Sequence, residues 1–139
     1  MSEDALKIAT KNAKANKADI QLKKLDFLND GLWDELGKFD IIISNPPYVL
    51  QKEISLMPTR VHKFEPHLAL FVDDDKGLIF YEKISAFSKN HLNEGGAVFL
   101  ECNEFNANAV LELYKDAGFA NSELQKDISG KDRLVIAWV

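Results

Sequence analysis

The sequence has little cysteine and no long apolar run. Cys102 is the single cysteine among 139 residues, so an internal disulfide is excluded. The apolar runs are only a few residues long, far short of the roughly 20 residues that a membrane-spanning helix requires. The amino terminus also lacks the basic and apolar regions of a signal peptide. Together these absences predict a cytoplasmic protein.

Basic residues are also fewer than acidic residues. The chain has 17 lysines and arginines against 22 aspartates and glutamates, which gives a formal net charge of -5. Binding to phosphate draws its affinity from clustered lysine and arginine, so this balance argues against a broad electrostatic grip on nucleic acid. The histidines, His62, His67 and His91, lack ligand spacing with Cys102 or with a carboxylate cluster. The sequence therefore predicts no metal site.

Patterns in the first half predict one helix, two strands and a binding loop. A helix is expected over Glu3 to Asn16, where small and apolar residues recur at helical spacing. Ile20 to Leu25 is expected to form a short strand that ends at Asp26. The apolar run within Phe39 to Ser44 is typical of a strand buried on both faces of a parallel sheet. The proline-bearing stretch 45–76 is long for a structureless connection, which favours a functional loop.

The second half alternates helices and strands. The expected elements are a helix over Gly77 to Leu92, a strand over Ala97 to Cys102, a helix over Ala107 to Ala117, and a terminal strand pair over Ser122 to Ile128 and Arg133 to Val139. This order predicts a single α/β domain over residues 1–139, a three-layer fold whose sheet is mostly parallel and ends in an antiparallel hairpin. Ligands of such sheets bind at the carboxyl ends of the strands, where Asp26, Asn45 and Glu101 fall.

The strongest chemical signal is Asn45-Pro46-Pro47-Tyr48, which directly follows the isoleucine-rich strand. Two successive prolines fix φ at about −65° and remove two backbone donors, which leaves carbonyl acceptors on a stiff turn beside the Asn45 side chain. The Asn45 side-chain oxygen and the Pro46 carbonyl could accept hydrogen bonds from both N–H groups of an amide or aromatic amine. The nitrogen lone pair would then point at a methyl sulfonium, with Tyr48 packed against the planar group. The motif favours methyl transfer to a planar nitrogen.

Four segments, which together extend over nearly the whole chain, carry a family resemblance. They are Ser2-Glu3-Asp4-Ala5-Leu6, Phe39 to Tyr48, Glu65-Pro66 with Ala69-Leu70 and Gly77-Leu78, and Lys126-Asp127 with Gly130-Lys131-Asp132-Arg133. In that order they are similar to the segment after the second strand, the signature, the downstream loop and the last hairpin of the N5-glutamine methyltransferases that modify peptide-chain release factors. That family belongs to the Rossmann-like methyltransferases that use S-adenosylmethionine.

The resemblance implies roles for particular residues. Asn45, Pro46, Pro47 and Tyr48 would bind the glutamine amide of a release factor, with Asn45 and Pro46 as its catalytic acceptors. Asp26, Phe27 and Asn45 would lie against S-adenosylmethionine. The implied reaction of the complete protein is N5-methylation of that glutamine. Asn103 and Asn106 stand where the family usually has a glycine and a glutamine, so no role is carried over to them.

The front of the family's cofactor site has no counterpart in the sequence. Such a site needs the first strand, its glycine-rich loop and an acidic residue that ends the second strand. The chain has seven glycines but no G-x-G-x-x-G-like cluster. We therefore expect an amino-terminally truncated sheet that lacks the first two strands, and a fragment that is inactive by itself. The strand containing Ile41 to Ile43 would then have an unprotected edge, which predicts self-association.

Three alternatives stay open. The motif could serve N6-adenine methylation of DNA or RNA, because the same acceptors suit an exocyclic amine and a flipped base would stack on Tyr48. The chain could instead be a non-catalytic remnant that acts as a binding module, since it lacks the glycine loop. Finally, Asn45 to Tyr48 could be a plain proline-rich turn, with Asn45 bonded to its own backbone.

Overall fold

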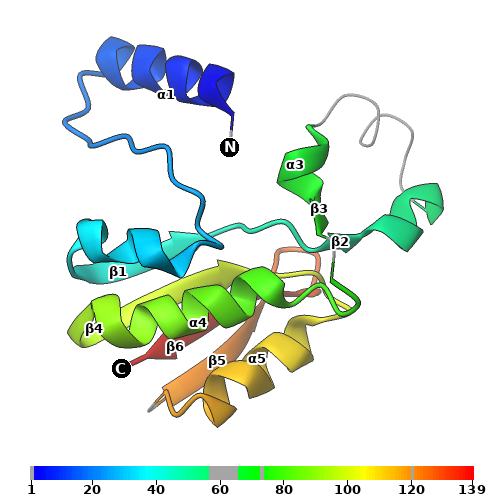
Figure 1. The fold of residues 1–139 in the computed structure, drawn as a ribbon. Coiled ribbons are helices and arrows are strands. Elements are labelled where there is room, and N and C mark those ends of the chain that lie inside the picture. The colour runs from blue at the N-terminus through cyan, green and yellow to red at the C-terminus, as the bar shows by residue number, and fades with distance from the viewer. Residues whose placement is uncertain (1, 57–65, 73, 120) are drawn as a thin grey trace.

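The computed structural model describes residues 2–56, 66–72, 74–119 and 121–139, so His62 and Glu65 lie outside the described residues (Figure 1). Its first elements are α1 (Glu3–Ala15), the 3-10 helix η1 (Asp30–Leu36), β1 (Phe39–Ser44), β2 (Val49–Leu50) and the 3-10 helix η2 (Gln51–Leu56). They are followed by α3 (His67–Leu70), β3 (Phe71–Val72), α4 (Ile79–His91), β4 (Leu92–Glu101), α5 (Ala107–Asp116), β5 (Asn121–Lys126) and β6 (Asp132–Trp138). Within these ranges, no helix is both long and apolar enough to cross a membrane.

The main sheet has the strand order β1-β4-β6-β5. β1 pairs in parallel with β4, while β6 is antiparallel to both β4 and β5. Three of its strands, β1, β4 and β5, therefore run in one direction and β6 runs against them. This arrangement confirms the predicted α/β class, with a mostly parallel sheet that ends in an antiparallel hairpin. β2 and β3 form a separate parallel pair.

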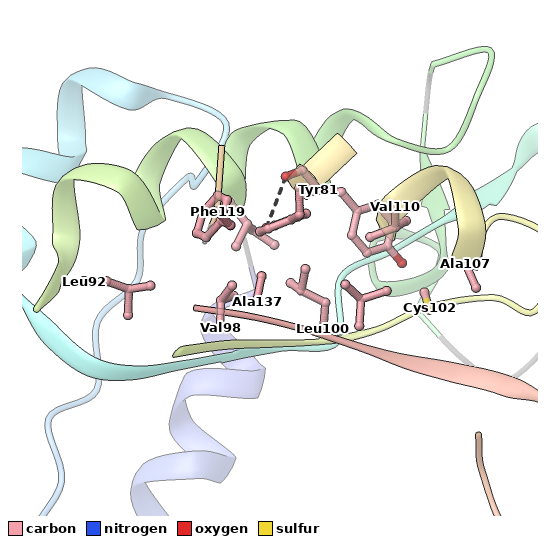
Figure 2. Close-up of a cluster of buried hydrophobic side chains, with 12 residues drawn as sticks. Tyr81, Leu92, Val98, Leu100, Cys102, Ala107, Val110, Phe119 and Ala137 are labelled. Carbon is pink, nitrogen blue, oxygen red and sulfur yellow. Dashed lines mark hydrogen bonds between the residues drawn. The ribbon is translucent and has the colours of Figure 1, made fainter. Parts of the chain in front are cut away.

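One face of the sheet packs against α4 and α5, the helices in extensive contact with it. Alternate residues of β4 and β6 point at these helices, and the fully buried ones are Val98, Leu100, Val135 and Ala137. Figure 2 shows the side chains of Val98, Leu100 and Ala137 in one cluster with those of Tyr81, Val110 and Phe119. Removing this apolar surface from water stabilises the fold by about 25 cal/mol per Å².

Two buried tyrosines cross that core. The Tyr81 hydroxyl donates to the carbonyl of Glu101 at 2.9 Å, and the Tyr114 hydroxyl lies 3.5 Å from the carbonyl of Tyr81, its acceptor, drawn as the dashed line in Figure 2. Burial raises the pKa of both phenols, because the tyrosinate anion would be poorly solvated there. The pair ties α5 to α4, and α4 to the end of β4.

The prediction that β1 is buried on both faces is wrong. Ile42 and Ser44 are half-buried on the helix side, but Ile41 and Ile43 are 57% and 78% exposed on the other. The described residues place no strand beyond the free edge of β1 and no helix in extensive contact with its outer face. An apolar run can be buried on both faces, but only where a second layer of structure covers the outer face.

The predicted strand over Ile20 to Leu25 is also wrong. This segment is extended but pairs with no strand among the described residues, and Ile20 is 57% exposed. A strand requires a hydrogen-bonded neighbour, which the local sequence cannot supply. The preceding helix α1 is confirmed, with the Ser2 hydroxyl accepting from the Ala5 N–H at 3.1 Å. Figure 1 shows α1 set apart from the sheet at the end of this extended segment.

The stretch 45–76, predicted as an irregular loop, contains β2, η2, α3 and β3 within its described part. The helix predicted from Gly77 begins at Ile79, because Gly77 has φ +69°, outside the helical region. Just before it, the Asp74 carboxylate accepts from the backbone N–H groups of Lys76 and Leu78, at 3.3 and 2.9 Å. The described part of this stretch is therefore structured, and it ends in a tight turn that contacts the motif at Tyr48.

Candidate active site

A cavity of about 340 Å³ opens at the carboxyl end of β1. Its walls come from the loop before η1, from the end of β1 with the motif, and from α4; the lining residues are Phe27, Ile42, Ile43, Ser44, Asn45, Pro46, Pro47, Phe80 and Ile84. Among the described residues that line it, only Ser44 and Asn45 contribute polar side chains and none is charged. A second cavity of about 290 Å³, beside Leu50, Val72 and Asp74, contains none of the predicted site residues.

Phe27 forms a fixed wall of the first cavity. Its ring centroid lies 5.4 Å from that of Trp33 and 5.2 Å from that of Phe87, and the Trp33 indole donates to the Phe27 carbonyl at 3.0 Å. Asp26 does not line the cavity; it is exposed, and its carboxylate accepts from the Leu28 N–H at 3.2 Å. The structure therefore brings Phe27, but not Asp26, to the motif. The cofactor roles of both residues stay predictions.

The motif presents Asn45 on a rigid base. Pro46 is buried and Pro47 is half-buried, which anchors the turn, while Asn45 is exposed. Within the described part of the chain the Asn45 side chain has no hydrogen-bond partner, in contrast to the plain-turn alternative in which it bonds its own backbone. Its amide oxygen is therefore available to accept from a ligand that enters the cavity.

Tyr48 lies behind the cavity instead of lining it. Its ring packs against the hydrophobic core, and its hydroxyl end lies near Glu101 and Arg133. Burial raises the pKa of Tyr48, the Glu101 carboxylate raises it further, and the Arg133 guanidinium opposes both. The phenol is thus neutral at physiological pH. Stacking of Tyr48 on a planar substrate group stays a prediction.

Several residues at this site were not predicted to belong to it. Phe80 and Ile84 line the cavity, although their helical spacing indicated only a core-facing stripe. Gly77 lies against the motif from behind, since a Cβ built on it would approach the Tyr48 carbonyl oxygen to 2.7 Å. Arg133, on the last hairpin, is close enough to Tyr48 for its positive charge to lower the pKa of that phenol. No local pattern could have found these contacts, because each joins segments far apart in the sequence.

The donor set decides which ligand groups the cavity suits. Apolar walls and the exposed Asn45 amide fit an aromatic ring and a planar N–H group, but the described part of the lining offers no carboxylate for ribose hydroxyls. The residues present therefore fit only one side of a nucleoside-type cofactor. Across the described ranges, no group of three or more histidine, cysteine, aspartate or glutamate side chains is arranged to hold a metal ion.

Comparison with known proteins identifies similar chains. Residues 2–98 match the family model described as Eco57I restriction-modification methylase. A release factor glutamine methyltransferase of Flavobacterium psychrophilum is 39% identical over 135 residues, which are 97% of this chain and 47% of that protein. The chain thus spans about half the length of such curated relatives.

Two solved structures share the fold. A methyltransferase from Pyrococcus furiosus superposes with a TM-score of 0.68 at 22% identity, over 99% of this chain and 59% of that one. The release-factor-specific protein-(glutamine-N5) methyltransferase from Alicyclobacillus acidocaldarius gives a TM-score of 0.52 at 24% identity, over 94% and 72% of the respective chains. These likenesses confirm the predicted α/β fold, which both of these methyltransferases share.

Replacing Gly77 by alanine tests the contact behind the motif. We expect Gly77→Ala to destabilise the protein by more than Gly118→Ala, a matched control that also has positive φ but where an added Cβ would meet no atom within 4 Å. The control costs about 1–2 kcal/mol from backbone strain alone. The clash with Tyr48 adds about 1–3 kcal/mol. Urea unfolding of both variants measures the difference, and equal losses would contradict a close contact between Gly77 and Tyr48.

Proposed function

Because this chain belongs to the methyltransferase family whose model it matches over residues 2–98, and its curated homologues are release factor glutamine methyltransferases, we propose that the complete protein methylates a release-factor glutamine. The observation that carries the proposal is the exposed Asn45 amide, which has no hydrogen-bond partner among the described residues, beside the buried Pro46 at a cavity walled by Phe27. A release-factor substrate would place the protein in the cytoplasm.

Asn45 and Pro46 perform the orienting step of the proposed reaction. An amide nitrogen is a weak nucleophile because its lone pair is delocalised. The Asn45 side-chain oxygen and the Pro46 carbonyl accept hydrogen bonds from the two N–H groups of the glutamine side chain, which holds the nitrogen in one orientation. Pro47 keeps the turn stiff, and Tyr48 anchors the end of the motif by packing against the core. No strong base is needed before methyl transfer.

S-adenosylmethionine would supply an electrophilic methyl group to this nitrogen. Of the predicted cofactor residues, Phe27 and Asn45 line the cavity and would contact it, while Asp26 would have to approach from outside the lining. Phe27 is suited to lie against adenine because Trp33 and Phe87 hold its ring in place. The ribose hydroxyls need acidic partners that this lining does not supply.

N6-adenine methylation is the second candidate. It is favoured by the description of the matching family model, a restriction-modification methylase. The net charge of -5 disfavours a nucleic-acid substrate, since phosphate contacts need clustered basic residues. A non-catalytic binding module is the remaining alternative, and it rests on the missing carboxylates of the cavity lining.

Calorimetric titration of S-adenosylhomocysteine into the 139-residue chain tests whether the chain alone binds the cofactor product. We expect no measurable binding at micromolar concentrations, because the cavity provides the apolar wall without ribose-binding carboxylates. The control is a fusion of this chain to the amino-terminal half of the Flavobacterium psychrophilum relative, which should bind. Micromolar affinity of the chain alone would mean that its own residues, with or without a second copy, complete the site.

The same fusion tests the acceptor role of Asn45. Asn45→Ala should reduce methyl transfer to a release factor at least about a hundredfold, because the amide loses its orienting acceptor. Asn93→Ala is a matched control, since Asn93 bonds Asp40 on the opposite end of the sheet. The assay includes an adenine-containing oligonucleotide in parallel. Transfer to the oligonucleotide alone would support the second candidate, and a wild-type rate for Asn45→Ala would refute the acceptor role.

We also propose that the chain self-associates through the free edge of β1. Phe39, Ile41 and Ile43 expose apolar surface along this edge strand, which carries no lysine or proline to block pairing. Sedimentation should show concentration-dependent association that Ile43→Lys abolishes. Ile128→Lys, at a fully exposed hairpin position, should leave it unchanged. A monomer at every concentration would contradict the proposal.

A further inference from the structure

Trp33 is bonded to the backbone of Phe27, the residue that forms the aromatic wall of the cavity. The indole Nε1 donates to the Phe27 carbonyl at 3.0 Å, and the two ring centroids lie 5.4 Å apart at an interplanar angle of 33°. Trp33 is only 8% exposed, so this bond is shielded from competing water. One contact to the carbonyl and one to the ring restrict both the position and the direction of the Phe27 side chain.

The backbone between the two residues reinforces this arrangement. The Asp26 carbonyl accepts from the Asn29 N–H at 3.1 Å, and the Asn29 carbonyl accepts from the Leu32 N–H, also at 3.1 Å. These bonds fold the chain between Phe27 and Trp33 into two consecutive turns. The indole therefore reaches back to a carbonyl that lies within a hydrogen-bonded turn.

The same indole packs against α4, which forms another wall of the cavity. The centroid of the Trp33 ring lies 5.5 Å from that of Phe87, at an interplanar angle of 77° that is typical of edge-to-face pairs. Phe87 follows Phe80 and Ile84 at helical spacing, and these two residues line the cavity. Trp33 thus connects the wall that contains Phe27 to the wall that α4 provides.

Lys83 joins η1 to α4 at the same place. Its ammonium lies over the Trp33 ring, 5.6 Å from the centroid, and pairs with the Asp30 carboxylate at 3.0 Å. The ion pair is partly exposed and contributes little by itself, but the cation over a buried indole adds an attraction between the same two elements. Both interactions oppose a separation of η1 from α4.

We propose that Trp33 is a positioning residue for the methyl donor: it holds the Phe27 wall in a fixed place against α4, so that the flat base of a nucleoside-type cofactor can lie against the Phe27 ring. The use of this wall by a cofactor rests on the proposed function. The physical link does not, because it is carried by the hydrogen bond to the Phe27 carbonyl and by the ring contacts with Phe27 and Phe87. Trp33 would then control cofactor affinity, although it is not among the residues that line the cavity.

The hydrogen bond is tested by NMR of the nitrogen-labelled 139-residue chain. The chain has two tryptophans, and Trp138→Phe on β6 leaves the indole signal of Trp33 alone in the spectrum. We expect the Trp33 indole hydrogen to exchange with solvent at least about tenfold more slowly than in the chain unfolded by urea, because a buried, bonded N–H exchanges only when the structure opens. Exchange as fast as in the unfolded chain would overturn the link to Phe27.

The consequence for the cofactor is measured in the fusion protein by calorimetric titration of S-adenosylhomocysteine. Trp33→Phe keeps an aromatic ring but removes the donor to the Phe27 carbonyl, and it should weaken binding about three- to tenfold, the size of one net hydrogen bond. Trp33→Leu also removes the ring contacts and should weaken binding further. Trp138→Phe is the matched control and should bind as the unsubstituted fusion does.

Two readouts separate positioning from a loss of folded protein. Partial unfolding would lower the number of binding sites per chain and kcat together. Displacement of Phe27 should instead raise the dissociation constant and the KM for S-adenosylmethionine, while the binding stoichiometry and kcat at saturating cofactor are retained.

A second variant applies if neither Trp33 substitution folds. Lys83→Met loosens the contact of η1 with α4 and should raise the same dissociation constant about two- to fivefold. Lys115→Met is its matched control, since it breaks a surface pair with Glu112 at 2.8 Å on α5 and should leave the constant unchanged.

Dissociation constants equal to that of the unsubstituted fusion, in both Trp33 variants or in Lys83→Met where those do not fold, would overturn the positioning role. A fusion that binds no S-adenosylhomocysteine would overturn the proposed function, and with it the role of Trp33 toward a cofactor. The exchange of the indole hydrogen would still decide whether Trp33 holds Phe27.

Discussion

The parallel pairing of β1 with β4 is the constraint on which the site depends. Its register sets Ser44 opposite Leu100, so Asn45 leaves β1 where β4 reaches Glu101. A parallel pair needs a long crossover, and α4 provides it while covering the core. The same crossover brings Gly77 behind the motif and Phe80 into the cavity wall. Site and core therefore share one set of contacts.

The buried polar groups extend this coupling to the end of the chain. Tyr81 satisfies the Glu101 carbonyl from inside the core, and Arg133 satisfies the next carbonyl, that of Cys102, from the hairpin. Glu101 is the last residue of β4, and Cys102 follows it directly. Leaving either without a donor would cost free energy, because buried polar groups are costly when unpaired. The motif thus rests on a scaffold whose hydrogen bonds fix the strand end.

We propose the cavity as an acceptor site for a planar nitrogen. It combines the exposed Asn45 amide with apolar walls, and none of the described residues that line it is charged. Such a site can orient an amide or an amine, which is why geometry alone does not separate the two substrate classes. The names of the relatives and the negative net charge favour a protein substrate, a release factor. The description of the family model instead favours a nucleic-acid base as substrate.

The sequence by itself determined the local elements and the chemical motif. Helical spacing located α1, α4 and α5, apolar runs located β1 and β4, and the two prolines marked the stiff turn, because each signal is short-range. The strand predicted over Ile20 to Leu25 was wrong, because strand formation depends on a pairing partner. The predicted burial of the outer face of β1 was wrong, because burial depends on a second layer. Only the tertiary structure decided that Phe27 and Asn45 line one cavity and that Arg133 bonds the Cys102 carbonyl, since long-range contacts follow from strand register and packing.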